Sequence, residues 1–210
     1  MKKLIFILLT LLSVLIVIWM TPAKSYLYWI LTKDIPIDTT NLPSQNKQIL
    51  NFIEQQGKRL APSYDKVVCT EYVINVLENF DEKLSPSDKS KIRIITQGDL
   101  KQLVSCEDSI IKGVSFYLSS SGKGIPITDL NDAKSGDFIQ FWNIRLGKAT
   151  GHCGIIRGID TDMGLISLYS SSPSTDGFGK QIYVLPEKYF IARLQGEVKH
   201  RNIYRSNSKP

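Results

Sequence analysis

The amino-acid sequence predicts an α+β domain in which helices come first and an antiparallel sheet of about five strands follows. In the first half of the chain, apolar side chains recur at helical spacing, most clearly at Tyr72, Val73, Val76, Leu77 and Phe80. After residue 135 the pattern changes to short apolar runs that are separated by Gly, Asp and Ser, which is typical of strands. This order of helices and then strands is the basis of the prediction.

Several helical segments are expected before the sheet. Ser44 can cap a helix over residues 44–57, and Gly57 favours its end. A second amphipathic helix begins at Cys69. Shorter helical pieces are predicted at 85–95, 99–104 and 108–118.

The second half of the chain is expected to form an antiparallel meander. The predicted strands are residues 138–142, 152–159, 165–170, 180–185 and 189–194. Residues 143–151 and 171–179 are rich in polar residues and glycine, so both are predicted to be loops.

The N-terminus predicts a membrane segment. Lys2 and Lys3 precede an apolar run over residues 4–20, which is long for the apolar region of a secretory signal peptide. No Ala-x-Ala site follows, and Tyr26, Tyr28 and Trp29 resemble interfacial anchors. We therefore expect residues 1–31 to be an uncleaved signal anchor with one transmembrane helix, rather than a cleaved peptide. Residues 32–43 would be a linker, 44–196 the domain and 197–210 a basic flexible tail.

Charge and cysteine content narrow the class of protein. The formal net charge of +6 and the sequence pI of about 9.1 suit anionic surroundings such as phospholipid headgroups or a cell wall. We expect no nucleic-acid partner, since no basic stripe with interleaved aromatic residues occurs. The sequence has three cysteines but no Cys-x-x-Cys pair and no histidine cluster, so no metal site is expected.

Cys69 is the candidate nucleophile. A thiol at the start of a helix lies at the positive end of the helix dipole, which favours the thiolate. The unpaired N–H groups of the first helical turn can stabilise an oxyanion. His152, one of only two histidines, is the candidate base. The alternative is that Cys69 is a buried core cysteine and His152 a hydrogen-bonded strand histidine.

Three segments in this order resemble the NlpC-type and CHAP-type cysteine hydrolases of the papain-like fold. They are Cys-Thr-Glu-Tyr-Val at 69–73, Ser-Gly-Asp-Phe-Ile-Gln-Phe at 135–141 and Gly-His-Cys-Gly-Ile-Ile at 151–156. The resemblance covers about residues 60–195 and is that of a divergent member. It implies helices packed on the sheet, Cys69 as nucleophile and His152 as base.

The resemblance also implies a third polar residue that orients the imidazole from the next strand. Ser172 is assigned to this catalytic position, with Ser170 as the alternative. Tyr64, Gln140, Asn143 and Ser170 are candidate substrate-binding residues, although packing and strand-surface polarity also explain them.

Two further cysteines are expected to be structural. Cys153 should point to the opposite side of its strand from His152 and lie in the core, because side chains alternate along a strand. Cys106 is expected to be buried among the helices, and Asp137 to have a structural role.

The resemblance implies amide hydrolysis, most often in the peptides of peptidoglycan, without a cofactor. The expected protein is thus a single-pass protein of a bacterial inner membrane, with its hydrolase domain on the exported side. Two alternatives remain open. One is a non-catalytic binding module of the same fold at the cell envelope, and the other is a lipid or acyl amide hydrolase or acyltransferase.

Overall fold

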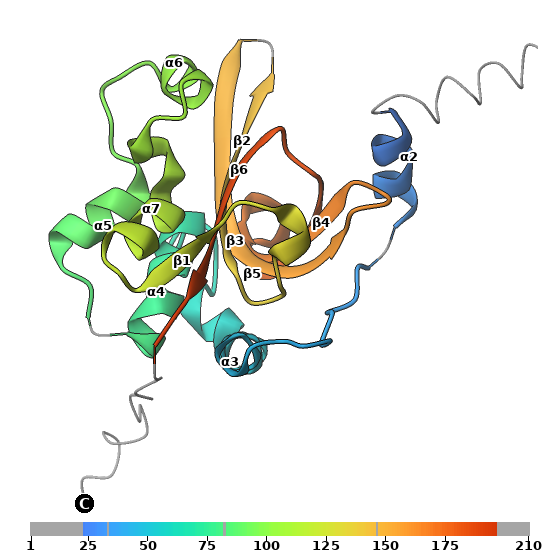
Figure 1. Cartoon of the computed structure of the whole chain (residues 1–210), viewed down its shortest axis with the longest axis horizontal. Coiled ribbons are helices and arrows are strands. Elements are labelled where there is room, and N and C mark those ends of the chain that lie inside the picture. The colour runs from blue at the N-terminus through green and yellow to red at the C-terminus, as the bar shows by residue number, and fades with distance from the viewer. Residues whose placement is uncertain (1–22, 33, 82, 146, 197–210) are drawn as a thin grey trace, which may run out of the picture.

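The computed structural model describes residues 23–32, 34–81, 83–145 and 147–196. The described chain is α+β, with a six-stranded antiparallel sheet in the order β1-β6-β2-β3-β4-β5. Figure 1 shows α5, α6 and α7 on one side of the sheet and α2 on the other side, beyond β4. The helices are α2 (Ala23–Leu31), α3 (Ser44–Leu60), α4 (Cys69–Phe80), α5 (Pro86–Arg93), α6 (Leu100–Ser105) and α7 (Gly113–Ser120), and the 3-10 turns are η1 (Ser109–Lys112), η2 (Leu130–Asp132) and η3 (Pro173–Thr175).

The strands run longer than the sequence pattern predicts. They are β1 (Gly124–Ile127), β2 (Phe138–Arg145), β3 (Lys148–Asp160), β4 (Leu165–Ser172), β5 (Gly177–Val184) and β6 (Lys188–Leu194). The sheet has six strands instead of about five because β1, a short strand that contains Pro126, pairs with β6. A proline is tolerated there because β1 is an edge strand.

The predicted loop at 143–151 is wrong. β2 and β3 form one long hairpin in which Arg145 pairs with Lys148 and Phe141 pairs with His152. Gly147 has a φ of 75°, a conformation that glycine adopts without a steric penalty. Polar side chains outside the core are compatible with this hairpin, because its backbone groups are satisfied by cross-strand hydrogen bonds.

Each face of the sheet carries its own hydrophobic cluster. α3, α4 and α7 pack on one face, where Phe138, Cys153, Ile155 and Tyr169 are buried. The other face carries a second cluster. Its buried members are Ile139, Phe141, Ile156, Ile166, Leu168 and Ile191.

The amphipathic helix predicted at Cys69 is confirmed. α4 begins at Cys69 and ends at Phe80, and its buried face packs against β3 and β4. The buried side chains are Tyr72, Val73, Ile74, Val76, Leu77 and Phe80. Burial of this face fixes the helix on the sheet, and thereby fixes where the Cys69 thiol lies.

α3 continues past the predicted stop. Gly57 lies inside the helix rather than at its end, and an added Cβ there would lie 2.5 Å from the Phe178 ring. That ring is stacked on Tyr169 and packed against Tyr72. Gly57 therefore serves close packing between α3 and β5, which a sequence pattern does not reveal.

Gly57→Ala is expected to destabilise the protein. The extra methyl would press on a ring that its neighbours hold in place, and such overpacking costs about 1–3 kcal/mol. The gain of roughly 1 kcal/mol in helix propensity offsets only part of this. The free energy of unfolding, measured with urea, should fall, whereas Gln55→Ala on the exposed face of α3 should leave it unchanged. Equal stability of Gly57→Ala and the wild type would contradict this packing.

Asp137 joins the start of the sheet to α3. Its buried carboxylate accepts hydrogen bonds from Arg193 at 2.8 Å, from Asn46 at 2.8 Å and from the backbone N–H of Lys134 at 2.8 Å. A buried carboxylate needs such partners because burial without them is costly. These contacts agree with the structural role expected for Asp137.

The segment expected to be a linker is packed against the domain. Ile35 and Leu42 are buried, and Asp34 pairs with the buried guanidinium of Arg157 at 2.5 Å. None of the helices in the described part of the chain combines the length and the apolar character needed to cross a bilayer. The predicted span at 4–20 and the predicted tail at 197–210 lie outside the described residues.

Cys106 does not have the burial expected of it. It caps the C-terminal end of α6 with an exposed side chain. α6 has only six residues. The hydrophobic cluster next to it buries Val104 and Ile111 rather than Cys106.

Candidate active site

Cys69 lies at the first position of α4, half-buried against the sheet. The N-cap residue is Val68, and among the described residues no side chain caps the helix. The first-turn N–H groups have no partner within the helix, so their positive ends remain directed at the region of the thiol. This position favours an anionic sulfur.

His152 reaches the site from β3. Its ring packs against two aromatic rings that also contact each other, with the Phe141 centroid at 5.7 Å and the Tyr183 centroid at 5.5 Å. Its Nε2 atom lies 2.9 Å from the Ser170 hydroxyl on β4. The two rings restrict the tilt of the imidazole, and Ser170 fixes its rotation.

A chain of hydrogen bonds continues behind Ser170. The Ser170 hydroxyl donates to Gln181 Oε1 at 2.5 Å, and the Tyr183 hydroxyl donates to the same oxygen at 2.7 Å. Gln181 Nε2 donates to the Thr175 hydroxyl at 3.0 Å, which fixes the amide orientation. Because the Ser170 proton is directed to Gln181, Ser170 accepts from His152, and Nε2 carries the ring proton. Nδ1 is then available to exchange a proton with a thiol.

The surroundings of Cys69 lower the pKa of its thiol from 9.0 to about 4. The largest cause is a hydrogen bond with the Cys153 side chain, and hydrogen bonding and charge interaction with His152 add to it, while burial opposes. The pKa of Cys153 is raised well above its usual value, first by the same hydrogen bond. The two shifts share one cause, a hydrogen bond in which the Cys153 thiol donates to the Cys69 sulfur and favours its thiolate form.

Alkylation of Cys69 is expected to persist in acid. Iodoacetamide reacts with the thiolate, and a pKa lowered to about 4 leaves Cys69 ionised at every pH above that value. The rate should stay level from neutral pH down to about 5 and fall below it, whereas an unfolded chain should lose its rate below about 8.5. Mass spectrometry of the Cys69 peptide in a Cys106→Ser background measures this.

Cys153→Ala provides the control for this pH profile. Removing the strongest donor should move the midpoint of Cys69 alkylation to higher pH, without abolishing alkylation. A wild-type midpoint near that of the unfolded chain would contradict the thiolate assignment.

The serine that contacts the imidazole is Ser170, the alternative, rather than Ser172, the residue assigned to that position from the sequence. The two hydroxyls lie on the same side of β4, but Ser172 interacts with Ser174 in η3 at 2.9 Å and caps that turn. Ser170, assigned to substrate binding, is buried and holds the imidazole. Of the two hydroxyls, that of Ser170 lies within hydrogen-bond distance of the His152 ring.

The other predicted substrate-binding residues are placed differently from one another. Gln140 is buried on the helix-covered face of the sheet, with its amide oxygen near Gly113 of α7, and so lies away from the His152 ring. Asn143 is half-buried and lines an open groove. Tyr64 lies before Cys69, and its pKa is raised first by burial and then by the charge of Cys69. Tyr64 and Asn143 thus remain candidates, whereas the burial of Gln140 favours packing.

The groove, of about 1420 Å³, adjoins the His152 side of the sheet. Its lining residues include Asn143 and Thr150 from the β2–β3 hairpin, Gln181 and Tyr183 from β5, and residues of α2. Ser174 and Thr175 of η3 extend it toward the segment that contains Tyr64, whose N–H donates to Asp176. Cys69 and His152 are not among the lining residues. Tyr183, whose ring centroid lies 5.5 Å from that of His152, connects the groove to the imidazole.

Sequence reasoning missed Gln181 and Tyr183, and missed that Cys153 contacts Cys69. The available signal was the alternation of Gln181 and Tyr183 in a strand, which places both on one face. For Cys153, strand alternation correctly indicated the core, but α4 packs on that same core face.

Comparison of the chain with protein-family models, curated proteins and solved structures gave no match. Across the described ranges, no group of three or more His, Cys, Asp or Glu side chains is placed to hold a metal ion. The functional argument therefore depends on the geometry of the site itself.

Proposed function

We propose that the chain is a papain-like cysteine hydrolase that cleaves amide bonds with Cys69 and His152. The observation that carries this proposal is a low-pKa thiol at a helix N-terminus beside an imidazole whose other nitrogen is fixed by Ser170. Such an arrangement of nucleophile, base and orienting group is what covalent acyl transfer requires.

The reaction begins when the Cys69 thiol passes its proton to His152 Nδ1 and the resulting thiolate attacks the amide carbonyl. The N–H groups of the first turn of α4 can stabilise the oxyanion. The carbon–nitrogen bond then breaks, and the leaving amine takes its proton from His152 Nδ1. A thioester and a neutral imidazole remain. His152 next takes a proton from water, the hydroxide attacks the thioester, and the carboxylic product and the thiol–imidazole pair are released.

The cellular setting is also a proposal. The basic start and apolar run of the sequence support a signal anchor in a bacterial inner membrane, with the domain exported. The resemblance to NlpC-type and CHAP-type hydrolases supports peptidoglycan peptides as the substrate. A lipid or acyl amide, or acyl transfer, is the alternative that the α2 residues lining the groove favour.

The test is digestion of purified peptidoglycan and of a panel of N-acyl amides by the full-length protein, followed by mass analysis. New amine and carboxylate ends on one substrate class, which are missing with Cys69→Ala, are the expected result. A Cys69 thiol that resists alkylation, together with no cleavage in the panel, would instead indicate a binding module of this fold.

A further inference from the structure

α2 packs against the domain through contacts with β5. The Trp29 indole N–H donates to the backbone carbonyl of Ile182 on β5 at 2.6 Å. Asp34, three positions after the last residue of α2, pairs with Arg157, which is buried in β3. Ile35 is buried directly after it. These contacts attach α2 to β5 and the segment that follows it to β3.

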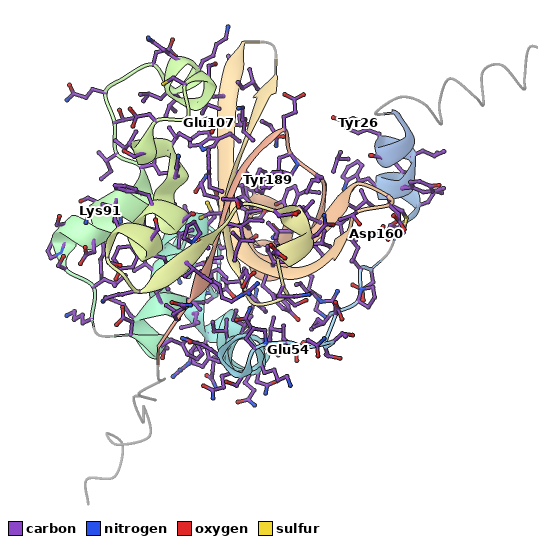
Figure 2. All side chains as sticks on the ribbon, in the orientation of Figure 1. Tyr26, Glu54, Lys91, Glu107, Asp160 and Tyr189 are labelled. Carbon is purple, nitrogen blue, oxygen red and sulfur yellow. The ribbon has the colours of Figure 1, made fainter. Side chains whose placement is uncertain are left out.

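The two sides of α2 face different surroundings. Ser25, Tyr26 and Trp29 line the groove, and Figure 2 labels Tyr26 on this helix. Leu27, Ile30 and Leu31 lie outside the groove, with 47%, 71% and 66% of their surface exposed. Three large aliphatic side chains on this nine-residue helix form an apolar face whose exposure to water is unfavourable.

The sequence indicates what covers this face. The apolar run over residues 4–20 ends three positions before Ala23, where α2 begins. A run of that length suits a bilayer, and a helix that follows it directly is held at the headgroup level.

We propose that α2 lies on the surface of a lipid bilayer with Leu27, Ile30 and Leu31 in contact with lipid, and that the groove receives its substrate from that surface. The substrate class is then an amide carried by an amphiphile whose apolar part stays in the bilayer. The substrate part of this inference rests on the proposed cysteine chemistry, whereas the bilayer contact of α2 does not.

The bilayer contact is tested by photo-crosslinking. The full-length protein is reconstituted in phosphatidylglycerol vesicles that contain a phospholipid with a diazirine near the headgroup end of its acyl chain. Crosslinks are expected on Leu27, Ile30 and Leu31. Ile95 is 68% exposed but distant in sequence and element, so it is the matched control and should not be crosslinked. Lipid crosslinks that are confined to residues 4–20, or protein–protein crosslinks at α2, would overturn the proposal.

Access to the site is tested with two electrophiles of equal chemistry. Chloroacetamide reaches Cys69 from water, and N-hexadecyl chloroacetamide reaches it from the bilayer. In each case a sulfur–carbon bond forms and chloride leaves. The ratio of hexadecyl to soluble labelling should fall about tenfold or more in Leu27→Asp/Ile30→Asp, because charged side chains are expelled from the lipid interface. Ile95→Asp should keep the wild-type ratio.

The outcomes separate the two proposals. If Cys69 reacts with chloroacetamide in acid but the ratio is insensitive to the α2 variant, the cysteine chemistry stands and delivery from the bilayer is refuted. If the crosslinks appear but Cys69 is inert to both electrophiles, the surface contact stands and the hydrolase proposal fails.

Discussion

Cys69→Ala is expected to lose nearly all amide hydrolysis. Removal of the nucleophile leaves only binding and oxyanion stabilisation, and comparable deletions lower kcat by about 10⁴-fold or more. The substitution should leave the fold intact, because Cys69 is only half-buried and the buried face of α4 begins at Tyr72. Initial rates on the amide found by digestion, measured with wild type and variant at equal concentration, test this.

Cys106→Ala is the matched control for that experiment. Cys106 is exposed at the end of α6, away from the helix that bears the candidate nucleophile, and its loss should leave the rate unchanged. A Cys69→Ala variant that turns over substrate at the wild-type rate would end the cysteine mechanism. Unchanged circular dichroism of the variant shows that any loss is not caused by unfolding.

His152→Ala is expected to lower kcat by about 10²–10⁴-fold, the usual contribution of a general acid–base residue. Ser170→Ala should cost roughly tenfold, since it removes one hydrogen bond worth about 1 kcal/mol and frees the ring to rotate. The larger effect belongs to the residue that moves the proton. Rates measured across pH show whether Ser170→Ala acts by misorienting the ring. In that case kcat falls, while the pH dependence that reports the Cys69 thiolate stays the same.

Ser172→Ala is the control for Ser170→Ala. The residue type, the strand and the face are the same, but the Ser172 hydroxyl contacts Ser174 rather than the imidazole. Its loss should have little effect on kcat. Gln181→Leu should resemble Ser170→Ala, because it removes the acceptor that orients the Ser170 hydroxyl. If Ser172→Ala proved as damaging as His152→Ala, the orienting role assigned to Ser170 would be wrong.

The elements that carry the two principal residues could be predicted from sequence because their signals are local. The apolar spacing from Tyr72 to Phe80 defines a helix that begins at Cys69, and the Gly-His pattern lies in a strand as expected. The sequence pattern does not distinguish Ser170 from Ser172 as the partner of the imidazole, because strand alternation puts both on one face. Which of them meets the ring depends on how β3 and β4 are offset.

Gln181 and Tyr183 depend on contacts that no local pattern encodes. They reach the site because β5 pairs with β4, and their polar groups find partners across the sheet. The length of the β2–β3 hairpin was also not predicted. Its polar residues are typical of a loop, but cross-strand pairing keeps them extended. Non-local pairing decided each of these features.

The hairpin turn at Gly147 also limits how the site could change during evolution. His152 and Cys153 are consecutive, and each contributes to the site from a different face of β3. A single-residue insertion near the turn that shifted β3 by one position would send the imidazole into the α4 core and the thiol to the groove. A shift of two positions would preserve the faces but would move the imidazole about 6–7 Å along the strand, away from Ser170. Length variation at this tip should therefore be tolerated only where the turn absorbs it and the β2–β3 register is unchanged, even though the tip is distant from the reacting atoms.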